Sequence, residues 1–164
     1  MSKDSDILNL TDEQKIEIRN AIVETAKSCL NIPYDIEPGG KVAWTGRGKW
    51  TDLTKPPVSL DCSGLAAGCV KKNGLKFPDG ALAQYNFTVA TDKPRPGDFA
   101  FFADKKDITK VDHVGIVYDD TYMIEARKLN PKASFPTGMV ILRPRSIWEK
   151  WENFVGYRSH PKLI

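Results

Sequence analysis

The stretch DCSGLAAGCVKKNG, residues 61–74, has the pattern of a helix that begins with a cysteine in its first turn. Asp61 is a good N-cap, Leu65 and Cys69 lie four residues apart, and the closing Asn-Gly pair is a stop signal, so a helix should begin at or just before Cys62. Free backbone N–H groups and the positive end of a helix dipole stabilise a thiolate, and they can also stabilise an oxyanion on an attacked carbonyl. The stretch makes Cys62 a candidate nucleophile. Taken alone it favours the alternative, a buried and inert cysteine, and the remaining segments of the chain decide for the nucleophile.

Length and composition predict one soluble globular domain over residues 1–164, with residues 1–10 as a flexible tail. No apolar run approaches the roughly 18 residues of a membrane span. The net charge of +3 is mild and spread along the chain. This does not favour a nucleic-acid partner but permits an anionic one, such as a cell wall.

The cysteines are Cys29, Cys62 and Cys69, an odd number, and no CxxC or Cys/His cluster has metal-ligand spacing. We therefore expect no disulfide framework, no metal and no cofactor. The first six residues lack the apolar segment of a Sec-type signal peptide, so delivery would depend on lysis, a virion or a secretion system.

A first helix is predicted from the capping-box pattern at Thr11 and Gln14. The apolar stripe of this helix includes Cys29, whereas its charged residues, Arg19 among them, lie elsewhere on the helix. The helix should end before Pro33. Residues 33–57 hold prolines and glycines without a clear period, which indicates an ordered loop region. Its tryptophans, Trp44 and Trp50, either line a cleft or fix the loop onto the core.

Five strands are expected after the cysteine helix, beginning with residues 99–102. A helical turn over 78–85 precedes them, and a short helix over 146–149 should open with a second capping box. The predicted strands cover residues 99–102, 111–118, 122–126, 140–142 and 154–158, with a charged loop over 104–110. Helices followed by antiparallel strands predict an α+β fold.

His113 is the better candidate of the two histidines, because it enters an apolar strand where a polar side chain needs a reason. His160 lies in a polar tail and is expected to be solvated. A three-residue turn centred on Asp120 would pair Gly115 with Glu125 and place Glu125 on the same sheet face as His113, whereas a two-residue turn would place it on the opposite face. We predict the three-residue turn, with Glu125 orienting the imidazole; the alternative is a solvent-facing carboxylate.

Together these segments resemble the ordered signature of the NlpC/P60 cysteine peptidases. The segments that carry the resemblance are Asp61-Cys62-Ser63-Gly64, Pro96-Gly97-Asp98-Phe99, His113-Val114-Gly115-Ile116-Val117, Met123-Ile124-Glu125-Ala126 and Val155-Gly156-Tyr157-Arg158. The resemblance implies a papain-like fold in which the cysteine helix packs on an antiparallel sheet of about five strands. It also implies cleavage of bacterial peptidoglycan stem peptides, commonly between D-γ-glutamate and the following diamino acid.

The resemblance further implies roles for particular residues. Cys62 would be the nucleophile, His113 the general base and then acid, and Glu125 the orienting residue. Asp61 and Ser63 would help to hold the peptide stem. Tyr34, in the Pro33-Tyr34 pair, would contact substrate or oxyanion.

The sequence departs from the family pattern in two places. The orienting position is most often histidine in the family and is Glu125 here, and the connection from Tyr34 to Asp61 is longer than usual, with Trp44 a loose match. A phage particle or an inhibitor protein are further possible partners. Two other functions stay open: an N-acetylmuramoyl-L-alanine amidase with the same triad, and a catalytically silent cell-wall-binding or virion module.

Overall fold

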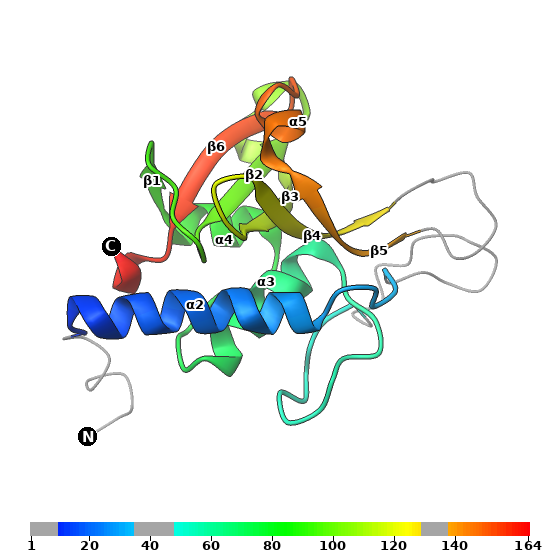
Figure 1. Cartoon of the computed structure of the whole chain (residues 1–164). Coiled ribbons are helices and arrows are strands. Elements are labelled where there is room, and N and C mark those ends of the chain that lie inside the picture. Colours follow the sequence, from blue (N-terminus) through cyan, green and yellow to red (C-terminus); the bar gives the residue numbers. More distant parts are fainter. Residues whose placement is uncertain (1–9, 35–47, 129–137) are drawn as a thin grey trace.

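The computed structural model describes residues 10–34, 48–128 and 138–164 as an α+β fold (Figure 1). Within these ranges its α-helices are α2 (Asp12–Ser28), α3 (Cys62–Lys72), α4 (Ala81–Phe87) and α5 (Arg145–Glu149). Its strands are β1 (Val89–Thr91), β2 (Phe99–Ala103), β3 (Val111–Val117), β4 (Tyr122–Lys128), β5 (Gly138–Pro144) and β6 (Phe154–Ser159). All of the expected tail at 1–10 except residue 10 lies outside the described residues, and Trp44 also lies outside them.

The strands form one antiparallel sheet in the order β1-β6-β2-β3-β4-β5. Helix α3 packs on β3 and β4, and α2 packs on α3, which gives the layers visible in Figure 1. The sheet has six strands where the sequence predicts about five. The missed strand, β1, has only three residues and lies at the edge of the sheet, next to β6.

Strand β2 is buried on both faces and therefore separates two apolar clusters. Phe99 and Phe101 belong to the main core with the residues of α3, whereas Phe102 belongs to a second cluster with Met123 and Trp148. A continuous apolar run such as FAFFA is typical of such a strand. The second cluster supports the site described below.

The turn between β3 and β4 has the predicted register. Ile116 pairs with Ile124 and Val117 with Met123, so the pairing is centred on Asp120. Asp119 stabilises the turn by accepting hydrogen bonds from the N–H groups of Thr121 and Tyr122, each at 2.7 Å. The three-residue turn is confirmed, and with it the strand register that places Glu125 on the same face of the sheet as His113.

Helix α2 begins with the predicted capping box. The N–H of Gln14 donates to Thr11 Oγ1 at 3.1 Å, and the Gln14 side chain accepts from the N–H of Thr11 at 2.9 Å. Cys29 is buried in the core, as expected. The second capping box, expected at Ser146, is wrong: α5 begins at Arg145 after Pro144, and no side chain caps it.

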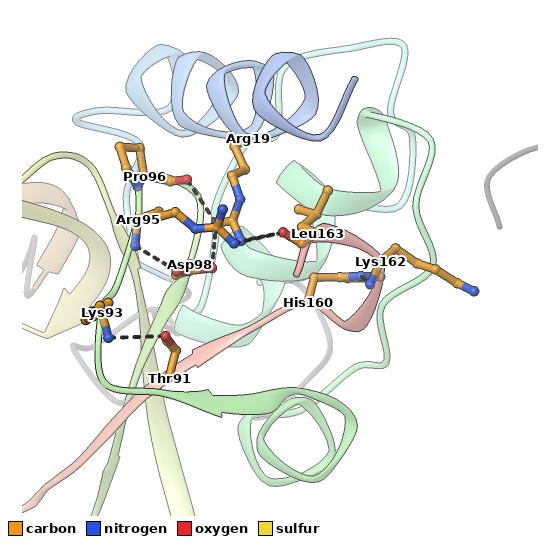
Figure 2. Close-up of polar contacts among 9 residues, drawn as sticks. All are labelled: Arg19, Thr91, Lys93, Arg95, Pro96, Asp98, His160, Lys162 and Leu163. Atoms are coloured by element: carbon orange, nitrogen blue, oxygen red, sulfur yellow. Dashed lines mark hydrogen bonds and ion pairs between the residues drawn. The ribbon is translucent and has the colours of Figure 1, made fainter. Parts of the chain in front are cut away.

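Arg19 was expected only to lie off the apolar stripe of its helix, and the structure shows that this charged side chain is buried and points into the protein (Figure 2). Its Nη1 donates to Asp98 Oδ1 at 2.6 Å, and its Nη2 donates to the carbonyl oxygen of Leu163 at 2.8 Å. Gly97 has a φ of +86°, and a Cβ there would press on the backbone of Arg19. The Pro-Gly-Asp segment is therefore a structural joint between α2, β2 and the C-terminus.

His160 is also buried, which contradicts the expectation of a solvated tail residue. The N–H of Lys162 donates to its Nδ1 at 3.1 Å, so Nε2 carries the proton that is donated to the carbonyl oxygen of Lys76 at 2.7 Å. Burial lowers the pKa of His160. The residue is a neutral packing element at the end of the chain.

Trp50 fixes its loop onto the cysteine helix, which was one of its two alternatives. It is buried against Gly68, where a Cβ would overlap the indole ring. Its Nε1 donates to the carbonyl oxygens of Asp52 at 3.0 Å and Lys55 at 2.9 Å. No helix within the described ranges has the length and apolar character needed to cross a membrane.

Candidate active site

Cys62 is the first residue of α3, as predicted. Asp61 is the N-cap, and its Oδ1 accepts from the N–H of Gly64 at 2.6 Å. Among the described residues, the N–H groups of Cys62 and Ser63 have no acceptor. The helix start therefore presents two free donors beside the thiol, which is the arrangement that stabilises negative charge.

Gly64 lets the preceding loop approach this helix start closely. The carbonyl oxygen of Gly48 accepts from the N–H of Asp61 at 2.9 Å. A Cβ on Gly64 would overlap that carbonyl oxygen. The glycine that follows the cysteine-serine pair is therefore required by packing, because only hydrogen leaves room for the loop.

The thiol of Cys62 lies against the beginning of β3. Its Sγ is 3.7 Å from the carbonyl oxygen of Asp112, and the thiol lies close enough to the His113 side chain to raise the pKa of that imidazole. His113 packs in turn on Phe102 and Trp148, with ring centroids 5.3 and 6.5 Å away. Residues 51 positions apart thus meet at one point, with the imidazole held by the second apolar cluster.

Glu125 is the residue behind the imidazole. Its Oε2 lies 3.2 Å from His113 Nε2, and its side chain is fully buried. The structure thereby places Cys62, His113 and Glu125 in one row of contacts. Because Nε2 faces the carboxylate, Nδ1 is the ring nitrogen left to face the thiol.

The charge state of His113 follows from these contacts. Burial lowers the pKa of this imidazole, but hydrogen bonds to Cys62 and Glu125, with their negative charge, outweigh burial and raise the pKa to about 10. A protonated imidazole beside a thiol favours the thiolate. The row of contacts therefore keeps His113 protonated at neutral pH beside the Cys62 thiol.

A cleft of about 540 Å³ opens beside Cys62. One wall is the start of α3, including Ser63; another is the segment from Asp79 to Ala83 at the start of α4; and the end of the cleft is formed by Val111 and Asp112. Gln84 of α4 donates to the carbonyl oxygen of Ser63 at 3.0 Å, which ties two walls together. Cys62 itself is buried, with 7% of its surface exposed, and it belongs to the lining of this cleft.

The other predicted site residues lie near Cys62 in different ways. Asp61 and Ser63 are buried, and the Ser63 hydroxyl donates to Asp61 Oδ1 at 3.2 Å. Tyr34 is half-buried; its backbone forms a parallel bridge with Leu60, and its N–H donates to the carbonyl oxygen of Gly138 at 3.0 Å. The structure thus places the backbone of Tyr34 beside Leu60, which precedes the first residue of α3, Cys62, by two positions.

Arg127 is the residue at this site that the sequence analysis missed. Its Nη1 lies 3.7 Å from Glu125 Oε1, the carboxylate oxygen that does not face the histidine. Its guanidinium stacks on Trp148 at 4.4 Å. The available signal was the strand period, because residues 125 and 127 of one strand share a face.

No group of three His, Cys, Asp or Glu side chains within the described ranges has the geometry to hold a metal ion. The polar groups gathered around the thiol are the imidazole, one carboxylate and backbone N–H donors. These are the components of nucleophilic acyl transfer.

Comparison with solved structures shows the fold that this chain shares with known proteins. A crystal structure of an NlpC/P60 family protein from Bacillus cereus superimposes with a TM-score of 0.64 at 24% identity, over 87% of this chain and 40% of that one. The P60 domain of an antigen from M. avium subspecies paratuberculosis gives 0.60 at 21% identity, over 89% of this chain and 96% of that one. The peptidoglycan hydrolase RipB from Mycobacterium tuberculosis gives 0.60 at 19%, over 92% and 67%.

At these identities the similarities establish the fold, and the chain spans less than half of the Bacillus cereus protein. No curated protein matches the chain. The model of the NlpC/P60 family, however, matches residues 39–138, more than half of the sequence, and this range contains Cys62, His113 and Glu125. The chain therefore belongs to the NlpC/P60 family.

Proposed function

We propose that this protein is a cysteine endopeptidase that hydrolyses peptidoglycan stem peptides, at the bond between D-γ-glutamate and the diamino acid. The observation that carries the proposal is the row of contacts from Cys62 through His113 to Glu125, beginning at an open cleft. Membership of the NlpC/P60 family and the fold shared with RipB, a peptidoglycan hydrolase, support the substrate class.

The first half of the reaction is acylation. The Cys62 thiolate attacks the amide carbonyl carbon, and the oxyanion that forms accepts hydrogen bonds from the free N–H groups of Cys62 and Ser63. His113, protonated at Nδ1, gives that proton to the leaving amine as the C–N bond breaks. The products of this step are a free amine and a thioester on Cys62.

The second half is deacylation. His113, now neutral, takes a proton from water, and the resulting hydroxide attacks the thioester. The C–S bond breaks, a carboxylic acid leaves, and the thiolate–imidazolium pair is restored. In both halves of the reaction Glu125 holds the imidazole through its 3.2 Å contact with Nε2.

We propose that the stem peptide lies in the 540 Å³ cleft, with Ser63 in contact with it. Asp61 orients the Ser63 hydroxyl through their 3.2 Å hydrogen bond and caps the helix at the same time. Tyr34 is proposed to contact substrate or oxyanion from the chain segment beside Leu60.

The test is mass spectrometry of the products from purified muropeptides, with wild type, Cys62→Ala and Glu125→Ala run side by side. We expect fragments split after D-γ-glutamate from wild type, none from Cys62→Ala, and a reduced yield from Glu125→Ala. Cys69→Ala is the matched control, because Cys69 lies in the same helix but is buried in the core. Release of intact stem peptides from the glycan would instead identify an amidase, and no cleavage at all would contradict the enzyme proposal.

A further inference from the structure

A second hollow, of about 450 Å³, lies beyond the far end of the catalytic row of contacts. We call it the arginine hollow, and it is lined by Arg127, Arg143, Ile147, Trp148, Lys150 and Trp151. Arg127 belongs both to its lining and to the contact with Glu125. The row from Cys62 to Arg127 therefore runs from the catalytic cleft to this second hollow.

The lining of the arginine hollow carries three positive charges and no negative one. Arg127 Nη1 is buried, and among the described residues it has no hydrogen-bond acceptor. Arg143 stacks on Trp148 at 4.8 Å without an ion pair in the described part of the chain. Burial and the nearby charge of Arg143 lower the pKa of Arg127, while the charge of Glu125 raises it. Glu125 thus partly balances Arg127 across 3.7 Å, whereas Arg143 has no counter-charge among the described residues.

The aromatic side of the arginine hollow also contains a hydrogen-bond donor without an acceptor among the described residues. Trp148 is 2% exposed, and its indole Nε1–H has no acceptor among the described residues. Trp151 is 39% exposed and Ile147 is 52% exposed at the rim. Buried donors without acceptors are costly, so a lining of this kind is explained by a ligand that brings acceptor oxygens.

We propose that the arginine hollow binds an oxyanion, a carboxylate or a phosphate, carried on a group with an apolar or ring face. Arg127 and Arg143 provide charge-assisted donors, and Lys150 adds a third charge. Trp151 and Ile147 offer a flat apolar surface on which a sugar ring can lie. An anion in this position is one side chain away from Glu125.

Two sources in a bacterial wall carry this chemistry: the free carboxylates of muropeptides and the phosphodiesters of an anionic wall polymer. The choice between these two sources rests on the proposed function, whereas the anion site itself does not. Binding is therefore measured separately from hydrolysis, in the Cys62→Ala variant, which leaves the arginine hollow intact.

The experiment is a titration followed through the indole N–H signals in ¹H–¹⁵N spectra. Inorganic phosphate, acetate, uncleaved muropeptides and polyglycerol phosphate are added in turn. We expect saturable shifts at Trp148 and Trp151. The signal of Trp50, whose N–H already has two acceptors, should stay unchanged.

The control variants distinguish specific binding in the arginine hollow from general electrostatic attraction of anions to a positively charged protein. Arg143→Gln should weaken binding roughly tenfold or more, since a charge-assisted bidentate contact is lost. Lys150→Gln, at an exposed position, should weaken it less. Lys93→Gln removes the same charge from an exposed position outside the hollow and should leave the affinity unchanged.

Each outcome decides the proposal. Tighter binding of polyglycerol phosphate than of muropeptides identifies the phosphate source, and the reverse identifies the carboxylate source. Shifts that do not saturate, equal weakening by Arg143→Gln and Lys93→Gln, or polymers that bind no better than inorganic phosphate would each overturn it. Hydrolysis by wild type without such binding leaves the proposed function standing, and binding without hydrolysis leaves the anion site standing.

Discussion

Replacing Glu125 with glutamine should shift the titration of His113 strongly. The substitution keeps the shape of the side chain and removes the negative charge that lies 3.2 Å from Nε2. Because Glu125 is fully buried, its charge is little screened by solvent. The protonated imidazole therefore loses a charge-assisted hydrogen bond, while the neutral imidazole is much less affected.

The size of the shift follows from that contact. A hydrogen bond to a charged group is worth about 1.5–3 kcal/mol, and one pKa unit corresponds to about 1.4 kcal/mol, so the pKa should fall by about 1–2 units. The starting point is the raised pKa of about 10. The value in Glu125→Gln should remain above that of a free histidine, because Cys62 still favours the charged ring.

The assay is an NMR titration of the imidazole nitrogens, which is simple because the chain has two histidines. His160 is the internal control: its pKa is lowered by burial, and it lies outside the catalytic row, so the substitution should not move it. In the enzyme, hydrolysis should fall at its alkaline limit as His113 loses its proton, and in Glu125→Gln this limb should move to lower pH. A wild-type His113 that titrates near 6.5, or one that Glu125→Gln leaves unmoved, would refute the reasoning.

Three further substitutions test the frame around the site. Asp98→Ala should lower the free energy of unfolding by about 3–5 kcal/mol, because it leaves Arg19 buried without its counter-charge; a loss below about 1 kcal/mol in urea unfolding, typical of surface pairs, would show that the joint is dispensable. Gly64→Ala should cost about 1–3 kcal/mol and reduce hydrolysis, because its Cβ displaces the Gly48 carbonyl from the helix start; a variant with wild-type melting temperature and rate would contradict this. The pKa of His160 is lower in the folded protein than in the unfolded chain, where it is about 6.5. The contribution of His160 to the free energy of unfolding is therefore complete above about pH 6.5 and is lost as the pH falls through the lower pKa of the folded protein. The stability advantage of wild type over His160→Gln should therefore narrow on acidification, and a constant difference in unfolding free energy would count against burial of a neutral ring.

Much of the site could be predicted because it depends on local pattern. The N-cap at Asp61 fixed the start of the cysteine helix, and the parity of the turn around Asp120 fixed the face of Glu125. Both signals act over a few residues, where turn chemistry and strand period are strong. The meeting of Cys62 with His113, in contrast, was expected only because a separated Cys/His pair is a recurring catalytic arrangement.

Apart from the capping box expected at Ser146, the errors concern residues whose partners lie far away in the sequence. Arg19 looks like a surface residue until Asp98, 79 positions later, is known to lie beside it. His160 likewise looks exposed in the sequence, because its hydrogen-bond partner, the carbonyl oxygen of Lys76, lies 84 positions earlier in the chain. Strand β1 carries too few residues for a period and exists through its pairing with β6. Such features depend on tertiary contacts, which local propensity does not contain.

The central claim is that Cys62 is a thiolate nucleophile activated by His113. Its most direct test is the rate of alkylation by iodoacetamide between about pH 6 and 8, followed by intact mass and by residual hydrolysis of muropeptides. We expect one alkyl group, on Cys62, because Cys62 is 7% exposed and lines the cleft, whereas Cys29 and Cys69 are 1% and 0% exposed in the core. The rate should change little over this range, and hydrolysis should disappear in proportion to labelling. A rate that rises about tenfold per pH unit, as for a free cysteine, or a fully alkylated protein that still cleaves muropeptides, would contradict the account.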